Sequence, residues 1–489
     1  MIHKFLFLKT SNAFVIEFYF IFALFYKTNV ISKYIINNIL SIHLKYTKIK
    51  MTKIKLTRRD FVKNTTLLTG GLMASPLLGN QRFFPAGKDE IKIALIGCGG
   101  RGRGAIVQAL SVKENTKLVA VADAFRDQVD DCMKTISKKE QGVSSRIDVP
   151  ESNKFVGFDA YKKAMELADV VILTTPPGFR PIHFEEAVRQ GKQIFMEKPV
   201  ATDPAGIKRV LDAAEIAKSK KLNVVVGLQR HYQSLYREMM SRVHDGKIGD
   251  IVSAQAYWNN DGVWVHPRKD GQTEMEYQMR NWYYFNWLCG DHITEQHIHN
   301  IDVINWAKKG YPVKAQGMGG REVRKGKDYG EIFDHHFVEF TYADGSILNS
   351  QCRHQKGTMS RVDEVLVGTK GSVVFGKREM KKSNGSLIYK HDDKNDKDAY
   401  QVEHDELFAA IAKGEYKFAD ADNGAKSTMT SILGRMATYS GQVIEWDKAI
   451  NSGISIMPTE FTWNAKMPLL PDADGMYAAA IPGKTKYFI

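Results

Sequence analysis

The most constraining feature of this sequence is an apolar hexapeptide that runs directly into a glycine-rich turn. Residues 91–96 read IKIALI, a continuous apolar run typical of a strand buried within a parallel sheet. The turn that follows, GCGGRG, carries three glycines at G-x-G-x-x-G spacing, namely Gly97, Gly99 and Gly102. The first allows a tight turn, the second lets phosphates approach the backbone, and the third lets the next helix pack closely. The pattern predicts a dinucleotide site at the start of a helix over residues 101–110, with Arg101 beside the phosphates.

An acidic residue stands where a ribose would lie in such a unit. A second strand, residues 117–122, ends in Asp123, which is 21 residues beyond Gly102. A carboxylate at this point accepts hydrogen bonds from the ribose hydroxyls, although it can also cap the following helix. Asp123 favours NAD, because the 2′-phosphate of NADP would meet a like charge, while Arg126 nearby keeps NADP possible.

Strands and helices continue to alternate as far as residue 228. We expect helices over 161–167, 183–190 and 204–217, and strands over 170–174, 193–196 and 223–227. Strands separated by such helices form right-handed crossovers and a doubly wound parallel sheet, in which ligands bind beyond the carboxyl ends of the strands. The residues that we expect to border the cofactor at these ends are Thr175, Pro176, Glu197, Lys198 and Gln229.

The pattern changes beyond Gln229. The sequence predicts a helix over 232–244, a strand over 251–258, and hairpins that pair 333–342 with 347–353 and 364–367 with 373–375. The predicted fold class is therefore α/β: an N-terminal Rossmann domain with a doubly wound parallel sheet, followed by a C-terminal α+β domain with an open, mainly antiparallel sheet.

A segment dense in aromatic and polar residues lies between the first strand of that second domain and residue 290. Its members are Trp258, Trp264, His266, Arg268, Arg280, Asn281, Trp282, Tyr283, Tyr284 and Trp287. Aromatic rings stack on sugar rings, and Arg and Asn hydrogen-bond to hydroxyls, so the segment predicts a carbohydrate substrate contacted by Arg280 and Trp282. Core packing explains about half of these aromatics equally well.

In these features the sequence resembles the Gfo/Idh/MocA family, which includes glucose-fructose oxidoreductase and inositol dehydrogenase. The likeness spans roughly residues 91–446. The matching motifs are the GCGGRG turn, Thr175-Pro176-Pro177, Met196-Glu197-Lys198-Pro199, Gly227-Leu228-Gln229-Arg230, Gly246-Lys247-Ile248-Gly249 and the segment from Gly290 to Asp302.

The resemblance implies roles for particular residues. Lys198 would sit between nicotinamide and substrate, and an acid-x-x-x-His pair on one helix, here Glu295 and His299, would supply the general base; the family more often has Asp at the first position. The sheet of the second domain would mediate contacts in a homo-oligomer. The segment around His292, which we expect to contact substrate, also resembles the family's NAD-dependent glycosidase branch.

These residue types suit the oxidation of a secondary alcohol. The reaction needs a hydride acceptor and a group that takes the hydroxyl proton. His299 titrates near neutral pH and suits the base, Glu295 four residues earlier would orient it, and Lys198 would stabilise the developing alkoxide. Electrostatics alone do not rank Lys198 against His299 as the final base.

Other interpretations of these histidines stay open. His297 is expected at a helix surface or cap. His292, Glu295 and His299 could also surround a metal as two histidines and a carboxylate, but no motif of known spacing supports this, and we predict no metal.

Composition narrows the function classes. The net charge is +14, but residues 1–90 hold 14 Lys/Arg and 4 Asp/Glu, so ten of these charges lie there. The remainder is nearly balanced, which removes the case for nucleic-acid binding. Four scattered cysteines, without C-x-x-C spacing, indicate neither a zinc site nor a disulfide framework.

Two N-terminal segments precede the predicted domains. We interpret residues 1–50 as an over-extended start before Met51; the apolar run over 13–26 falls short of the roughly 20 residues that span a bilayer. Residues 51–85 contain Arg58-Arg59-Asp60-Phe61 before an apolar stretch, which resembles a twin-arginine export signal. We therefore expect a periplasmic protein without a stable membrane span, or a cytoplasmic one if the leader is not functional.

The predicted domains are residues 88–228 for the Rossmann domain, 229–445 for the substrate and oligomerisation domain, and 446–489 for a tail that wraps the surface.

Three functions compete on this basis. The first is an NAD(P)-dependent oxidoreductase that acts on a secondary hydroxyl of a sugar or glycoside and keeps its cofactor bound, since no free nicotinamide pool exists outside the cytoplasm. The second is an NAD-dependent glycosidase that works by transient oxidation and elimination. The third is a non-catalytic nucleotide-binding sensor, against which intact Lys198, Glu295 and His299 weigh.

Overall fold

The structure, a computed structural model, describes residues 90–486, so the predictions for the leader over 1–85 fall outside it. Within residues 90–486 no helix has both the length and the apolar character needed to cross a bilayer.

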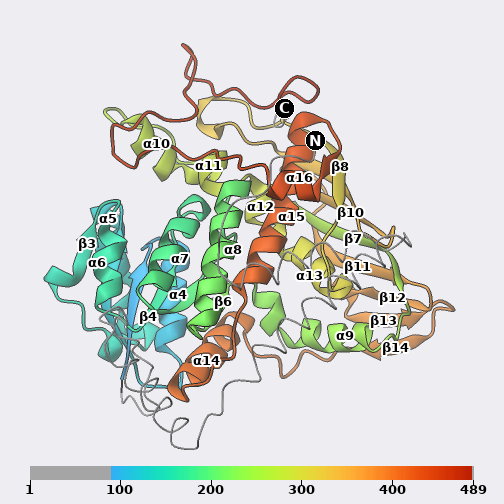
Figure 1. The fold of residues 1–489 in the computed structure, drawn as a ribbon, viewed down its shortest axis with the longest axis horizontal. Coiled ribbons are helices and arrows are strands. Elements are labelled where there is room, and N and C mark those ends of the chain that lie inside the picture. Colours follow the sequence, from blue (N-terminus) through green and yellow to red (C-terminus); the bar gives the residue numbers. More distant parts are fainter. Residues whose placement is uncertain (1–89, 487–489) are drawn as a thin grey trace, which may run out of the picture. The chain divides into compact units, whose positions relative to one another are not determined.

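The first domain is the predicted Rossmann fold (Figure 1). Its sheet has the strand order β3-β2-β1-β4-β5-β6 and is parallel throughout. Its main elements are β1 (Ile91–Ile96), α4 (Gly100–Leu110), β2 (Thr116–Asp123), α5 (Arg126–Ile136), β3 (Lys154–Val156), α6 (Ala160–Glu166), β4 (Val170–Leu173), α7 (Arg180–Arg189), β5 (Gln193–Met196), α8 (Pro204–Ser219) and β6 (Val224–Val226). The strand order reverses between β1 and β4, which is where a doubly wound sheet binds its ligand.

The strands of the first domain form because their residues are apolar on both faces. In β4 and β5 every residue is buried, as expected for strands covered by helices on each side. Helix α8 begins at Pro204, and the Asp203 carboxylate caps it by accepting the Gly206 N–H at 2.7 Å.

The second domain is built on a mixed, mainly antiparallel sheet, as predicted. Its strand order is β14-β13-β12-β11-β7-β10-β9-β8-β15, and of its pairs only β7 with β10 is parallel among the described residues. The strands are β7 (Ile251–Asn260), β8 (Lys314–Gly320), β9 (His335–Thr341), β10 (Ile347–His354), β11 (Arg361–Gly368), β12 (Gly371–Val374), β13 (Glu379–Lys382), β14 (Leu387–Lys390) and β15 (Ile444–Glu445).

The helices of the second domain are α9 (Ser234–His244), α10 (Glu274–Arg280), α11 (Asn286–Cys289), α12 (His292–Glu295), α13 (Ile298–Lys308), α14 (Ala399–Ala412), α15 (Ala421–Ser440) and α16 (Trp446–Ile450). Helices α13 and α15 pack on this sheet, while other helices of the domain pack against the first domain or the C-terminal segment. Helix α14 packs against the first domain, because Leu407, Phe408 and Ile411 share a core cluster with β1 and α4.

The C-terminal segment runs over the surface, as predicted, and is mostly exposed or half-buried. After α16 it crosses above α10 and α11 (Figure 1), and it buries Ala465, Met467 and Tyr477 in one core cluster with the α10–α11 region. The sequence did not predict these three contacts, because scattered apolar residues without periodicity give no sign of the neighbours they pack against.

Candidate functional site

The glycine-rich turn has the steric demands predicted for it. Gly97 has φ +100°, and a Cβ there would lie 2.6 Å from the Thr175 nitrogen. At Gly102 a Cβ would lie 2.0 Å from the Gly97 carbonyl oxygen, so helix α4 approaches β1 this closely only with glycine. A Cβ at Gly99 would meet nothing within 4 Å, because this residue faces the cavity described below. The turn therefore leaves room for phosphates at the start of α4.

Asp123 ends β2 with its carboxylate fixed by the backbone. It accepts the Cys98 N–H at 2.8 Å and the Phe125 N–H at 3.0 Å. Burial raises the pKa of this carboxyl above its usual value. Since a carboxylate has about four acceptor sites, two remain for ribose hydroxyls. Arg126 is paired with Asp130 at 3.0 Å and Glu151 at 2.6 Å instead of facing the cavity, which favours NAD over NADP.

The ends of β4 and β5 are joined by a buried arginine. The Arg180 guanidinium donates to the Thr175 carbonyl at 2.6 Å and to the Glu197 carbonyl at 2.9 Å. Burial lowers the pKa of this guanidinium to about 10. These bonds fix the backbone around Thr175 and Pro176.

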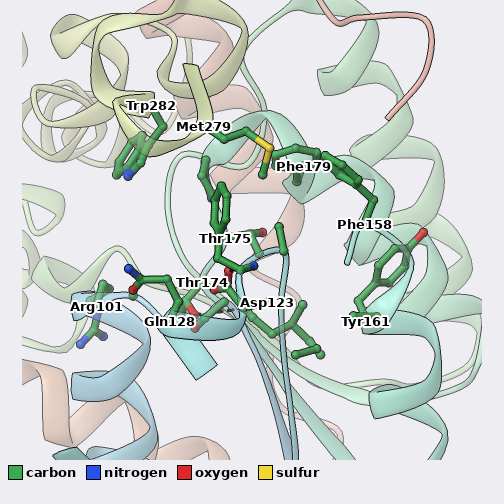
Figure 2. A pocket seen from close by; sticks show the side chains of 18 of the residues that line it. Arg101, Asp123, Gln128, Phe158, Tyr161, Thr174, Thr175, Phe179, Met279 and Trp282 are labelled. Atoms are coloured by element: carbon green, nitrogen blue, oxygen red, sulfur yellow. Dashed lines mark hydrogen bonds between the residues drawn. The ribbon is translucent and has the colours of Figure 1, made fainter. Parts of the chain in front are cut away.

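A cavity of about 310 Å³ lies beyond the carboxyl ends of these strands (Figure 2). Six of the predicted cofactor residues line it: Gly97, Gly99, Arg101, Asp123, Thr175 and Pro176. Residues of the second domain close its other side, and Figure 2 shows Met279 and Trp282 across the cavity from Arg101 and Asp123. The orientation of Gly99 and the free acceptor sites of Asp123 fit a dinucleotide in this cavity.

Four further predicted cofactor residues, Gly102, Glu197, Lys198 and Gln229, are not among those that line this cavity. Glu197 accepts a bond from Arg101 Nε, and Arg101 also donates to Gln108 at 2.9 Å and to Glu403 at 3.5 Å. Glu197 thus positions Arg101. A Cβ at Gly227 would lie 2.8 Å from the Glu197 carboxylate, which explains the glycine there.

Lys198 is held by Glu295. Its ammonium donates to the Glu295 carboxylate at 2.9 Å and to the Glu295 carbonyl at 2.5 Å. Both side chains are largely buried, with 12% and 14% exposed. A charge-assisted bond in such a place orients the ammonium firmly.

The prediction that Glu295 and His299 lie on a single helix is wrong. Helix α12 ends at Glu295 and α13 begins at Ile298, so the two side chains do not share a helical face. Glu295 orients Lys198 rather than His299. The i, i+4 spacing could not show this, because it assumes an unbroken helix.

His299 is buried, and its imidazole is neutral. Burial and the nearby Lys198 charge lower its pKa well below the usual value. Its Nδ1 has no hydrogen-bond partner among the described residues. A neutral imidazole with a free nitrogen can accept a proton.

Other buried polar atoms around the reacting centre also lack partners within residues 90–486. They are Gln229 Oε1, Trp258 Nε1 and the Tyr283 hydroxyl. The Trp258 ring stacks with the His299 ring at 6.2 Å, and the Glu295 charge helps to raise the pKa of Tyr283. Buried polar groups are normally bonded, so these three atoms are exceptions, although their residues do not line the cavity described above.

His292 lies elsewhere, and its predicted contact with substrate requires correction. It is fully buried, and its Nδ1 lies 2.7 Å from Asp291. The Asp291 carboxylate also accepts the Phe333 N–H at 2.9 Å and the Tyr439 hydroxyl at 2.5 Å. His292 thus belongs to a buried hydrogen-bond cluster that anchors the start of α12. Asp291, His292 and His336 have potential ligand atoms within 4.8 Å of one another. Asp291 lies 2.7 Å from His292 Nδ1 and 3.3 Å from His336 Nε2, while His292 Nε2 has no partner among the described residues.

His297 is also placed differently from the prediction. It stands at the N-cap position of α13, but it is buried and bonded to Ser350 at 2.7 Å rather than exposed. His292, Glu295 and His299 do not form a group of possible ligand atoms within 4.8 Å of one another among the described residues, which contradicts the metal arrangement considered for them.

Arg280 and Trp282, predicted to bind substrate, both line the cavity. Arg280 forms a bidentate ion pair with Asp127 at 2.6 and 2.9 Å and lies 3.7 Å over the Phe125 ring. Sequence reasoning missed Asp127 and Phe125, and it also missed Phe158 and Phe179, which line the cavity as well. No local pattern marks them, since they meet only through contacts distant in sequence.

Comparison with known proteins agrees with this geometry. The site and fold define a dinucleotide-binding oxidoreductase. Residues 91–227 match the family described as oxidoreductase family, NAD-binding Rossmann fold, and residues 236–374 match the GFO/IDH/MocA C-terminal domain. The chain belongs to the Gfo/Idh/MocA family, and NAD is its cofactor.

The individual relatives share only low sequence identity with this chain. Inositol 2-dehydrogenase of Azotobacter vinelandii is 26% identical over 72% of this chain and 95% of its own length. Inositol 2-dehydrogenase of Gluconacetobacter diazotrophicus is 30% identical over 32% of this chain and 40% of its own length. The structure of scyllo-inositol dehydrogenase from Lactobacillus casei, with bound NAD(H) and scyllo-inositol, matches with a TM-score of 0.55 and 19% identity over 73% of this chain and 99% of that one.

Proposed function

We propose that the protein oxidises a secondary hydroxyl of a sugar, glycoside or related polyol and that it keeps NAD bound between turnovers. The observation that carries this proposal is the pairing of the Lys198 ammonium with Glu295 next to the neutral, buried His299. The names of the inositol dehydrogenases among its relatives support a cyclic polyol as the kind of substrate.

The residues would divide the chemistry as follows. NAD supplies the hydride acceptor when bound. His299 takes the hydroxyl proton on its imidazole, and the Lys198 ammonium stabilises the negative charge that develops on the substrate oxygen. Glu295 holds Lys198 in place. The sequence left the choice of base open. We choose His299, because its neutral imidazole can accept a proton, whereas the Lys198 ammonium already donates to the carboxylate and the carbonyl of Glu295.

The first experiment is mass spectrometry of the nucleotide released when the purified protein is denatured. Co-purified NAD(H) supports retention and justifies a screen of inositols and glycosides without added nucleotide. An empty protein speaks against retention. In the screen, turnover that needs a second redox substrate indicates an oxidoreductase, whereas repeated cleavage of a glycoside without one indicates the NAD-dependent glycosidase. Absence of any reaction moves weight to a sensor.

A substitution then tests the reacting centre. Lys198→Met should abolish hydride transfer, with a loss of at least about 10²–10³-fold as for a lost oxyanion donor, while nucleotide stays bound. Lys208→Met, at an exposed ion pair with Asp212, is the matched control. Full turnover in Lys198→Met would contradict the catalytic assignment.

We also propose export through the twin-arginine route and assembly into a homo-oligomer. Arg58-Arg59 and the apolar stretch after them support export, which a reporter fused to residues 51–85 tests: secretion should stop when both arginines become lysines.

For assembly, Met318 and Phe337 form a cross-strand pair on the exposed sheet face and are 72% and 38% exposed. Light scattering of Met318→Ser/Phe337→Ser should report a smaller particle than wild type.

A further inference from the structure

The C-terminal segment supports the wall of the cofactor cavity from behind. Phe125, Phe158 and Phe179 line the cavity. Trp463 lies 5.2 Å from Phe125 and 4.7 Å from Phe158, and Phe461 lies 5.3 Å from Phe179, measured between ring centroids. Phe125 stands two residues after Asp123, the predicted ribose ligand. Trp463 therefore braces the part of the wall that would face the adenosine half of the dinucleotide, and Phe461 braces the wall at Phe179, after β4.

Both ends of this bracing segment are tied down. On one side, Ile456 N–H donates to the buried Asp203 carboxylate at 2.8 Å, and the Ile454 carbonyl accepts Ala205 N–H at 3.1 Å, at the start of α8 in the first domain. On the other side, the Leu469 carbonyl accepts a bond from Gln278 of α10 at 2.9 Å. The segment thus bridges the two domains across the cavity wall.

Beyond Leu469 the chain remains attached to the same region. Tyr477 is buried, and its hydroxyl bonds to Glu274 of α10 and to Arg268 at 2.8 Å. Helix α10 is therefore fixed by the tail at its first residue as well as in its middle.

A second link joins α10 to the first domain at the same place. Arg280, the last residue of α10, lines the cavity, lies 3.7 Å over the Phe125 ring and forms the bidentate ion pair with Asp127 of α5. Phe125 is therefore held between the guanidinium of Arg280 and the indole of Trp463.

We propose that residues 454–477 and the Arg280–Asp127 ion pair form a clamp that slows the release of the dinucleotide. This inference rests on the proposed retention of NAD and names the residues that cause it. Release of the adenosine half requires the wall at Phe125 and Phe158 to move, and such movement breaks the contacts with Trp463 together with the ion pair. Contacts of this kind act mainly on the dissociation rate.

The test measures how fast NADH leaves the full-length protein, followed by the loss of its bound fluorescence after addition of excess NAD. Asp127→Asn removes the ion pair without touching the core and should accelerate release about two- to fivefold, as expected for a partly exposed pair. Trp463→Ala should accelerate release at least about tenfold, because it removes two aromatic contacts and their buried area. Leu470→Ala, at an exposed position of the same segment, is the matched control and should release NADH at the wild-type rate.

The outcomes separate the clamp from the function. Release at the wild-type rate in both Asp127→Asn and Trp463→Ala overturns the clamp while NAD binding stands. A wild-type protein that binds no NADH overturns the proposed function and the clamp together. If Trp463→Ala does not fold, the release rate of Asp127→Asn alone decides whether the clamp exists. In that case the double variant Asp127→Asn/Arg280→Gln should release NADH no faster than the faster of its two single variants, because both changes remove the same ion pair.

Discussion

Removal of the Glu295 charge perturbs the reacting centre at its best-defined contact. The Glu295 carboxylate lies 2.9 Å from Lys198 Nζ, and the two side chains are 14% and 12% exposed. A hydrogen bond to a charged group contributes about 1.5–3 kcal/mol, which corresponds to about 10- to 150-fold in rate if it is lost in the transition state. Glu295→Gln keeps an oxygen acceptor and the backbone carbonyl bond at 2.5 Å, so we expect a loss of about tenfold in kcat/KM, near the lower bound. Glu295→Ala should approach the upper bound.

The assay is single-turnover hydride transfer with a substrate found in the screen, compared with its deuterated form. Glu322→Gln, which loses an exposed partner of Lys325, is the matched control and should behave as wild type. Glu295→Asp should recover part of the loss, since it restores the charge on a side chain that is one methylene shorter. Wild-type rates in Glu295→Ala would refute the idea that this carboxylate positions Lys198.

Three further predictions concern the cofactor site and the core. Gly102→Ala should abolish nucleotide binding, because its Cβ would lie 2.0 Å from the Gly97 oxygen. Gly104→Ala, whose Cβ would meet only the end of Arg101 at 3.4 Å, should fold and bind nucleotide normally. Equal binding of nucleotide by the two variants in calorimetry would contradict the steric argument. Asp123→Asn should raise the affinity for NADP relative to NAD at least about tenfold, since it removes a like-charge repulsion of about 1–4 kcal/mol; an unchanged ratio in fluorescence titrations would count against the role of Asp123. Burial lowers the pKa of His404 to about 3, so below pH 6.5 the unfolded chain binds a proton at His404 that the folded protein does not bind. The contribution of His404 to the free energy of unfolding therefore falls by about 2 kcal/mol between pH 7.5 and pH 5. His404→Leu should remove this part of the pH dependence in denaturant titrations at the two pH values, and an unchanged difference between them would show that His404 is not responsible.

The local signals in this sequence predicted the first domain closely. The apolar run of β1, the glycine spacing and Asp123 fix geometry through backbone sterics and short-range hydrogen bonds, which are encoded within about 30 residues. The same is true of the β9–β10 hairpin, whose turn residues lie between two alternating strands.

The sequence named the candidate catalytic residues, but it did not predict the contacts between them. Lys198, Glu295 and His299 come from motifs, yet the break between α12 and α13 decides that Glu295 bonds to Lys198. A spacing of four residues indicates a shared face only if the helix is continuous, and the backbone around Gln296 and His297 is set by buried partners such as Ser350.

The sequence by itself therefore determined the Rossmann domain and the NAD cofactor, and it named the candidate reacting side chains, because each depends on local sterics or on a short motif. Only the tertiary structure decided that His292 is buried, that Glu295 serves Lys198, and that Trp463 braces Phe125. Each of these depends on packing between segments far apart in the chain. Such packing follows from the shape of the whole core, which no local pattern records.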